Sequence, residues 1–297
     1  MCPYANSELP DTAEAHFAVF ATPLINQAVS HAATLQTHPD AEVLHKLRVA
    51  LRRLRSLLWA YRPLLDKEVD DRQRALFKDL AAAAGQTRDW DILIDLLGKV
   101  SAEKNIPLDH LRAARAAASD RSRATLCHAE ISAKLDDALK SSDVALSHAH
   151  RHMPLKKFAQ KRLQSAERTL HKRMRAASRS TGSDYEAYHE VRKAGKKVRY
   201  LLDFFEPMLG HKQLKSVKAL KKIQKRFGAL NDVVASQELL NDNRALFASD
   251  SAARQALKAL EKERKKNFAR PPACCADSGQ RFTAKENGNM LTQPSPF

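Results

Sequence analysis

A 21-residue segment that occurs twice is the feature that most restricts how this chain can fold. His45–Leu65 aligns without gaps on His189–Leu209, and eight of the 21 columns are identical. The similarity continues downstream, where Leu80–Leu97 aligns on Ile223–Leu240. Two matched segments in the same order indicate one helical unit that is used twice.

The composition favours helices in both copies. Alanine, leucine, lysine, arginine and glutamate dominate, and the 297 residues include only eight glycines. These abundant residues lose the least free energy on entering a helix. We therefore predict an all-α fold of two pseudo-symmetric helical bundles, of about four helices each, with a basic central groove or pore. Helices are expected near 12–36, 41–61, 69–84, 89–100 and 108–140, and near 155–178, 185–205, 212–227, 232–246 and 251–267.

The predicted domain spans 8–267, with one bundle in each half of the chain. The first bundle covers 8–147, a histidine-rich linker covers 148–154, and the second bundle covers 155–267. The remaining segment, 268–297, is rich in proline, glycine, asparagine, glutamine and serine. Such a composition cannot bury enough apolar surface to fold, so we expect this tail to be disordered.

Three matched pairs of residues are expected at helix ends. In each copy a proline follows the motif helix and stops it, a glycine provides the left-handed C-cap of the next helix, and an aspartate caps the start of the one after that. The pairs are Pro63 and Pro207, Gly85 and Gly228, and Asp89 and Asp232.

Each motif helix carries a row of basic side chains beside its apolar stripe. At ~100° per residue the row falls within an arc of roughly 80°, next to the leucine-rich sector. A solvated face normally mixes charges and lies opposite the apolar stripe, so a row of one sign beside the core predicts an anionic ligand. The first row is His45, Arg48, Arg52 and Arg55, and the second is His189, Arg192, Lys196 and Arg199.

The overall charge is compatible with this interpretation. The chain has 51 Lys+Arg against 34 Asp+Glu, a formal net charge of +17, although a solubilising surface would explain that excess equally well. Two basic rows related by a pseudo-two-fold axis would form one long groove, which suits a linear polyanion. Arginine binds phosphate oxygens through paired, charge-assisted hydrogen bonds. The two motif histidines could donate to phosphate or be bonded within the protein, and the sequence leaves both roles open.

Other basic residues are weaker candidates for the same site. They lie on the helices that follow the motif, or beside the predicted cap Asp89, and only some of them match across the repeat. Lys46, Arg53 and Lys197 are expected to project to the far side of the motif helices as solvated charge. The weaker candidates are Arg72, Lys78, Arg88, Lys215 and Lys221.

The doubled pattern H-x-x-R-x-x-x-[RK]-[RK]-[LV]-R, followed each time by G-x-x-x-D, resembles the conserved histidine α-helical domain (CHAD) family. The resemblance covers roughly residues 10–267, and Gly195 is a departure that weakens the second motif helix. It implies a two-bundle helical structure with a basic pore that binds inorganic polyphosphate, often at polyphosphate granules. Carried over position by position, it implies all eight residues of the two rows as ligands.

Nothing in the sequence indicates catalysis, a cofactor or a metal site. There is no glycine-rich phosphate loop, nucleophile elbow or HExxH motif, and no E-x-E-x-K signature of the triphosphate-hydrolysing domain of the CYTH type found in some relatives. The alternating His148, His150 and His152 lack a carboxylate or thiolate partner nearby. We therefore expect a non-enzymatic polyphosphate-binding protein with no cofactor and no bound metal.

The expected location is the cytoplasm, in association with polyphosphate granules. The four cysteines form no CxxC pair, no secretory signal precedes them, and no apolar run approaches the roughly 18 residues of a membrane span. Two alternatives remain. A nucleic-acid-binding helical protein would need a recognition module or aromatic platform that is not visible. A polyphosphate-processing enzyme, or a regulatory subunit of polyphosphate metabolism, is the other alternative and would need a divalent-metal carboxylate cluster that is not visible. The oligomeric state is left open.

Overall fold

The computed structural model describes residues 11–38, 40–100, 106–148, 152–179, 185–210 and 216–268, and these segments are helical apart from their connections. The predicted all-α class is confirmed. The predicted tail, 268–297, lies outside the described residues except for its first position. The α-helices are α1 (Phe17–Thr37), α2 (Ala41–Tyr61), α3 (Lys67–Ala83), α4 (Gln86–Val100), α5 (Leu108–His128), α6 (Ile131–Ser147), α7 (Leu155–Arg179), α8 (Tyr185–Phe205), α10 (Ser216–Asp242) and α11 (Asp250–Phe268). Three short 3-10 helices are η1 (Arg62–Leu64), η2 (Glu206–Met208) and η3 (Arg244–Leu246).

The two motif helices have the predicted bounds, 41–61 and 185–205. Asp40 caps the first of them by accepting a hydrogen bond from the Glu42 backbone N–H at 3.2 Å. A proline in the following 3-10 helix ends each motif helix, at Pro63 in η1 and Pro207 in η2. The apolar stripe of α2 is buried as its spacing predicts. The side chains of this stripe are each at most 2% exposed, and they are Leu44, Leu47, Leu51, Leu54 and Leu58.

The helix predicted over 108–140 is divided into α5 and α6. The break falls at Glu130, whose φ of 46° and ψ of 49° put it in the left-handed region. A non-glycine residue costs about 1–2 kcal/mol in that conformation. Neither glycine nor proline occurs near this position, so the local sequence carried no signal for the break.

The predicted helix ends at Gly228 and Asp232 are wrong, because α10 continues through both residues. A Cβ added to Gly228 would meet no neighbouring atom, and no glycine of the described segments has a positive φ. Gly85 follows the end of α3 but is not a left-handed cap either. Asp89 lies inside the first turn of α4 rather than at its cap.

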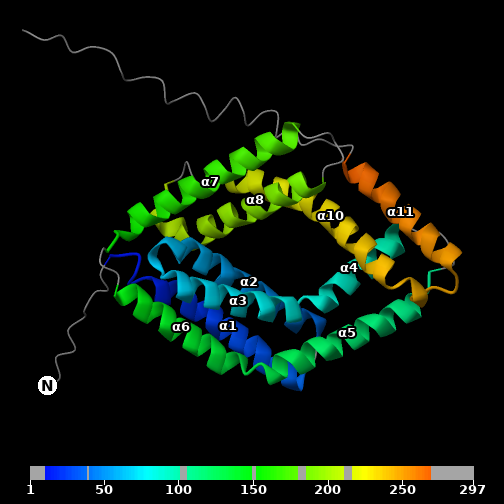
Figure 1. The fold of residues 1–297 in the computed structure, drawn as a ribbon, viewed down its shortest axis with the longest axis horizontal. Helices are drawn as coiled ribbons and strands as arrows, with labels where there is room; N and C mark the ends of the chain where they lie inside the picture. Colours follow the sequence, from blue (N-terminus) through cyan, green and yellow to red (C-terminus); the bar gives the residue numbers. More distant parts are fainter. Residues whose placement is uncertain are drawn as a thin grey trace, which may run out of the picture.

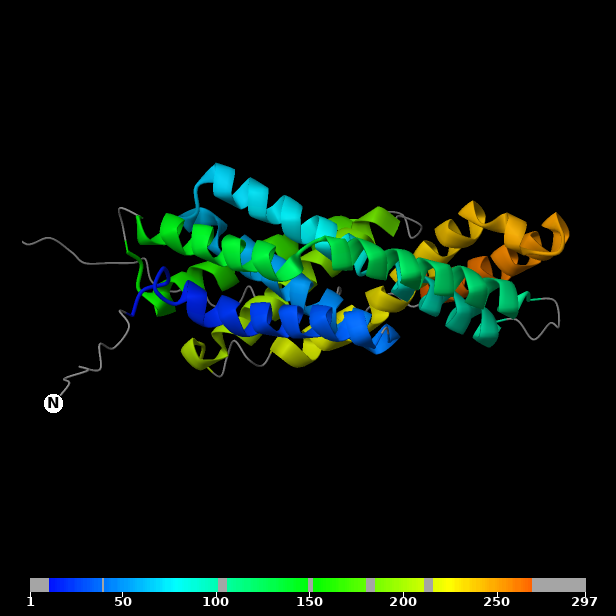
Figure 2. The same cartoon turned by 90° about the horizontal axis from the view of Figure 1, so that it is seen from below.

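Helices pair in the same way in the two halves of the chain. Within each half, α1 packs along α2 as α7 packs along α8, and α4 packs on α5 as α10 packs on α11. Between the halves, α2 contacts α8 and α4 contacts α10. Figure 1 shows the resulting ring of helices, with α4, α5, α10 and α11 at one end. Figure 2 shows that the molecule is long and comparatively thin in the perpendicular view.

The larger hydrophobic core joins helices from both halves. It contains, among others, Phe17 of α1, Leu51 of α2, Leu163 of α7, Val198 of α8 and Phe227 of α10. Within it, the rings of Tyr61 and Phe158 lie 4.9 Å apart, so the aromatic packing also crosses between the halves. The prediction of one bundle in each half of the chain is therefore wrong for this core.

The smaller core is shared in the same way. It contains Leu93 of α4 and Leu111 of α5 from the first half, and Val233 and Leu240 of α10 with Leu260 of α11 from the second. The unbroken α10 runs from the larger core into this one. Each half of the chain thus contributes helices to both cores, and the two motif helices pack in the same larger core.

The starts of the two halves are also tied together. Thr12 and Pro154 form an isolated antiparallel bridge. The buried Glu14 carboxylate accepts hydrogen bonds from the Met153 backbone N–H at 3.2 and 3.3 Å. This connection includes the end of the predicted linker 148–154, of which residues 149–151 lie outside the described part of the chain. Among the described helices, none is apolar over enough length to span a membrane.

Candidate anion-binding site

The middle members of the two basic rows meet where α2 packs against α8. Arg48 and Arg52 come from α2, Arg192 and Lys196 from α8, and all four side chains are half-buried. Burial, with the charges of Arg52, Arg192 and Arg48, lowers the pKa of Lys196 to about 7. Burial also lowers the pKa of Arg192, and Arg52 and Arg48 add to that shift. The structure therefore brings these four cations close enough to repel one another.

Arg88 joins this group from α4. Burial lowers the pKa of Arg48, the carboxylate of Asp89 opposes this, and the charges of Arg52 and Arg88 lower the pKa further. Arg88 also acts on both aspartates of the repeat, Asp89 and Asp232. We refer to the five side chains as the central basic cluster. Its members are Arg48, Arg52, Arg88, Arg192 and Lys196.

The cluster is not neutralised by internal ion pairs. Over the part of the chain that the structure describes, four of its members form no ion pair or side-chain hydrogen bond, and Arg192 donates only to the Asn231 side-chain oxygen, at 3.3 Å. The Nε atom of Arg192 is buried without a partner among the described residues. Half-buried cations normally pair with carboxylates, so this arrangement favours an external anion.

Two aspartates at equivalent positions of the repeat lie beside the cluster. Burial raises the pKa of Asp89, opposed by Arg48 and reinforced by Asp232. Burial likewise raises the pKa of Asp232, opposed by Arg192, Arg88 and Lys196. Each carboxylate is therefore partly desolvated and feels the other. Both residues were predicted to cap helices, whereas in the structure they contribute to the electrostatics of the site.

The two motif histidines lie in different surroundings. His189 is held within the protein, because its Nδ1 lies 3.0 Å from the Asn231 Oδ1 atom and 3.3 Å from the Tyr185 hydroxyl. Tyr185 also donates to Asn231 Oδ1 at 3.2 Å. His45 is exposed and lines a cavity at the start of α2. Of the two roles left open for these histidines, His189 has the internal one, whereas His45 stays exposed at the cavity.

The last members of the rows extend away from the cluster. Arg55 is exposed, and its pKa is lowered by burial of part of the side chain and by Arg52 and Arg74. Arg199 lies 3.9 Å from an Asp203 oxygen. Its guanidinium is 4.9 Å from the centre of the Tyr200 ring. The last cation of the α2 row, Arg55, thus has no ion-pair partner in the described residues, whereas the last cation of the α8 row, Arg199, is paired with Asp203 of the same helix.

Most of the weaker candidates lie apart from the cluster. Arg72 and Lys78 are exposed on α3, and Lys221 is exposed on α10. No contact joins these three side chains to the cluster in the described structure. Lys215 lies outside the described residues. Arg88 is the exception among the weaker candidates, because it lies beside the other members of the cluster.

A second group of cations surrounds Trp59. The Lys197 ammonium and the Arg162 guanidinium lie 4.7 and 4.6 Å from the indole ring centre. Arg162 also donates to the Trp59 carbonyl at 2.9 Å. Arg53 lies 5.8 Å from the centre of the Phe204 ring. Lys197 is exposed as predicted but also covers the Trp59 ring, whereas Arg53 is half-buried against Phe204, so the prediction of solvated charge is wrong for Arg53.

Tyr185 and Asn231 are site residues that reasoning from the sequence missed. The repeat alignment pairs Asn231 with Arg88, one residue before the matched aspartates, and pairs Tyr185 with Ala41. These substitutions at equivalent positions were the available signal. A polar side chain in place of a cation indicates that the second copy uses this position inside the protein.

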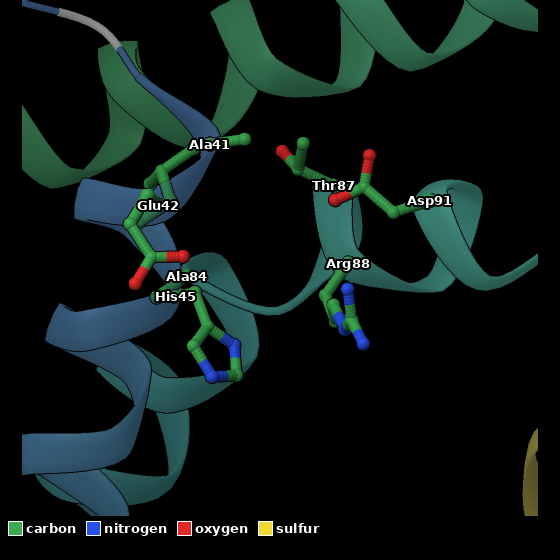
Figure 3. Close-up of a pocket in the computed structure, with 8 residues that line it drawn as sticks. Ala41, Glu42, His45, Ala84, Thr87, Arg88 and Asp91 are labelled. Carbon is green, nitrogen blue, oxygen red and sulfur yellow. The ribbon is translucent and has the colours of Figure 1, made fainter.

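A cavity of about 260 Å³ lies between the start of α2 and the start of α4. Its polar lining comes from Glu42 and His45 of α2, and from Thr87, Arg88 and Asp91 of α4. Figure 3 shows the His45 ring and the Arg88 guanidinium on the same side of the cavity, with Thr87 and Asp91 at the opposite side. Arg88 therefore links the cavity to the central basic cluster. Neither here nor elsewhere in the described residues does a group of three or more side chains have the composition of a metal site.

The fold and the site define an all-helical protein in which equivalent helices of two repeats join their cations in one cluster. A family model, the CHAD domain, matches residues 20–241. The match covers well over half of the chain, so the protein belongs to the CHAD domain family, as the doubled histidine motif predicted.

Solved structures agree with this fold. The chain is similar to the CHAD domain from the plant Ricinus communis, with a TM-score of 0.67 and 24% sequence identity over 89% of this chain and 90% of that one. It is also similar to PptA from Streptomyces chartreusis, with a TM-score of 0.53 and 17% identity over 85% of this chain and 95% of that one. At these identities the likeness concerns the fold alone. A search of curated proteins found no match.

Proposed function

We propose that this protein binds inorganic polyphosphate along the central basic cluster and does not hydrolyse it. The observation that carries the proposal is the meeting of unpaired cations from two repeats. Arg48 and Arg52 of one motif helix act electrostatically on Lys196 of the other. Membership of the CHAD domain family supports the same ligand.

A linear polyanion fits the arrangement better than a single small anion. Five cations from three helices share the cluster, and His45 and Arg55 extend the α2 row beyond it on either side. A chain of phosphates can contact successive guanidiniums through charge-assisted hydrogen bonds, each contributing about 1.5–3 kcal/mol.

Ligand binding also accounts for the energetic penalty of the cluster. Bringing half-buried cations together destabilises the folded protein, since burial and like charges both oppose the charged forms. Bound phosphates would replace water around these groups and restore favourable Coulomb interactions. With polyphosphate as the ligand, a location at cytoplasmic polyphosphate granules follows as part of the proposal.

The test is a competition experiment. Labelled long-chain polyphosphate is bound to the protein at fixed salt and displaced with unlabelled polyphosphate, duplex DNA or pyrophosphate. We expect polyphosphate to displace it at the lowest concentration. Arg48→Ala combined with Arg192→Ala is expected to weaken binding at least about tenfold, because each substitution removes a charge-assisted contact.

The matched control is Lys46→Ala combined with Lys193→Ala. These lysines lie on the same two helices, and replacing them removes the same total charge as the first double variant. Both lysines are exposed, and they pair with Glu42 and Glu190. Equal weakening by both double variants would reduce the effect to net charge and refute the site. Displacement by DNA at equal phosphate concentration would favour the nucleic-acid alternative. Phosphate release on addition of magnesium would contradict the absence of hydrolysis.

A further inference from the structure

The residues that line the cavity beside His45 are replaced at the matching place in the second repeat. Its lining residues Ala41, Thr87 and Arg88 align with Tyr185, Leu230 and Asn231. In the second repeat, the larger Tyr185 side chain bonds to both His189 and Asn231. The two ends of the cation rows therefore differ, because the first borders a polar cavity and the side chains at the second are bonded to one another.

Thr87 indicates that the cavity receives a polar ligand. Its side chain is only 2% exposed, and its hydroxyl has no hydrogen-bond partner within the described residues. Figure 3 shows the hydroxyl oxygen turned toward the start of α2, across the cavity. Leaving a buried hydroxyl unpaired costs about 1–3 kcal/mol, which a ligand acceptor in the cavity would recover.

The other donors around the cavity suit an anion. The Arg88 guanidinium forms no ion pair in the described part of the chain, and α4 begins at Gln86, so its positive dipole end lies beside the cavity. Asp91 lines the cavity but is paired with Arg115 at 2.9 Å. Glu42 is exposed and only 3.8 Å from Lys46. That ion pair uses Oε1, and the Oε2 atom of Glu42 forms no ion pair or hydrogen bond in the described residues, so it remains available as an acceptor.

This mixture of donors and one available carboxylate discriminates between the phosphates of a chain. An internal phosphate has two non-bridging oxygens and remains ionised, so Glu42 repels it. A terminal phosphate has three non-bridging oxygens and holds a second proton that titrates near pH ~6. Below about that pH it can accept from Thr87, His45 and Arg88 and donate its remaining proton to Glu42, whereas an internal phosphate has no proton to donate at any pH. The cavity volume of about 260 Å³ corresponds to roughly nine water molecules, enough for such a group.

We propose that the Glu42–His45–Thr87–Arg88 cavity binds the terminal phosphate of a polyphosphate chain, so that the chain enters the basic cluster from one defined end. This inference rests on the proposed function. The protein then recognises chain ends in the cavity and internal phosphates in the central basic cluster. Arg88, which contributes to both, marks the junction between them.

The experiment compares two ligands that differ only at their ends. One is polyphosphate of narrow length distribution with free ends, and the other is the same material with both terminal phosphates capped as alkyl esters, which removes one oxygen charge and the titrating proton. Full-length protein is titrated with each at one pH and salt concentration. We expect the free-ended chain to bind several-fold more tightly.

Two cavity variants should reduce that preference by different routes. Thr87→Val, which preserves side-chain shape, is expected to weaken binding of the free-ended chain and leave the capped chain unchanged. Glu42→Gln is expected to strengthen binding of the capped chain, since it removes the repulsion. The matched control is Glu186→Gln, at the position of the second repeat that aligns with Glu42, and it should retain the wild-type preference.

The outcomes separate the two proposals. Equal binding of free-ended and capped chains by the wild-type protein would overturn end recognition while leaving binding by the cluster intact. If both Thr87→Val and Glu42→Gln keep the preference for the free-ended chain, the terminal phosphate binds elsewhere and the proposal for this cavity is refuted. Binding of neither chain would refute the proposed function itself. Circular dichroism and thermal melting verify that each variant is folded.

Discussion

The two ends of the site begin with the same histidine motif and differ in what surrounds it. At the second end, His189 is bonded to Asn231 and to Tyr185, so its ring serves the internal structure. At the first end, His45 is exposed beside the unpaired Arg88. Two substitutions between the repeats account for this difference, namely tyrosine in place of Ala41 and asparagine in place of Arg88.

A repeated motif therefore preserves the position of the backbone more closely than the role of a side chain. The pairing of α1 with α2 and of α7 with α8 is equivalent in the two halves. The residues that decide whether a histidine is free lie outside the H-x-x-R motif. Internal symmetry can therefore supply one end that holds the structure and another that remains open to a ligand.

The largest expected effect comes from converting the first end into a copy of the second. Ala41→Tyr with Arg88→Asn places the same pair of side chains beside His45 as surrounds His189. We expect affinity for long-chain polyphosphate to fall roughly tenfold to a hundredfold, because one charge-assisted contact of about 1.5–3 kcal/mol is removed and the cavity is filled. Isothermal titration calorimetry at fixed salt measures the change.

Its control is Arg112→Asn, which removes the same charge from α5. Arg112 is exposed and paired with Asp109 at 3.2 Å, so its loss should change affinity less than about twofold. If closing the first end leaves affinity at the wild-type value, the two ends are functionally equivalent and the comparison fails.

Much of the fold was accessible from the sequence because helical periodicity is local. The motif helices, their apolar stripes and the prolines that end them follow from spacing alone. The packing of both halves into two shared cores was not predicted. It depends on α10 running unbroken through Gly228, and a glycine inside a helix looks the same in sequence as a glycine at a helix end.

The site was predictable to a similar extent. Helical spacing placed Arg48 and Arg52 on one face of α2, and the repeat supplied Arg192 and Lys196. The partners that distinguish the two ends could not be found in this way, because Tyr185 approaches Asn231 only through the packing of α8 against α10. Contacts between residues so far apart in the sequence depend on tertiary packing, which local periodicity does not encode.

The repeats also differ at their centre, where Lys196 aligns with Arg52. Because the pKa of Lys196 is lowered to about 7, this lysine is charged below pH 7 and loses its charge as the pH rises. A bound polyanion favours the charged form, so binding takes up a proton and weakens with rising pH. We expect affinity to fall about tenfold from pH 6.5 to 8.5, measured by titration in buffers of equal ionic strength.

Lys196→Arg should flatten that pH profile, since arginine remains charged throughout the range. Asp232 acts on the same lysine and on Asp89, and burial raises the pKa of both carboxyl groups. Their protonation at lower pH would also strengthen binding, so any slope that persists in Lys196→Arg should lie on the acidic side. A full decline above pH 7 in that variant would show that another group controls it.

The smallest expected effect concerns stability and compares one hydroxyl at each end. Tyr185→Phe removes a donor to Asn231 and should lower stability by about 0.5–1.5 kcal/mol. This corresponds to a melting temperature lower by roughly 1–4 °C for a protein of this size. Thr87→Val removes a buried hydroxyl without a partner in the described residues, so it should leave the melting temperature unchanged or raise it. Calorimetry without ligand measures both.

A loss in Thr87→Val as large as that in Tyr185→Phe would mean that the Thr87 hydroxyl is already satisfied, because only a bonded hydroxyl contributes net stability. The first end would then be as closed as the second.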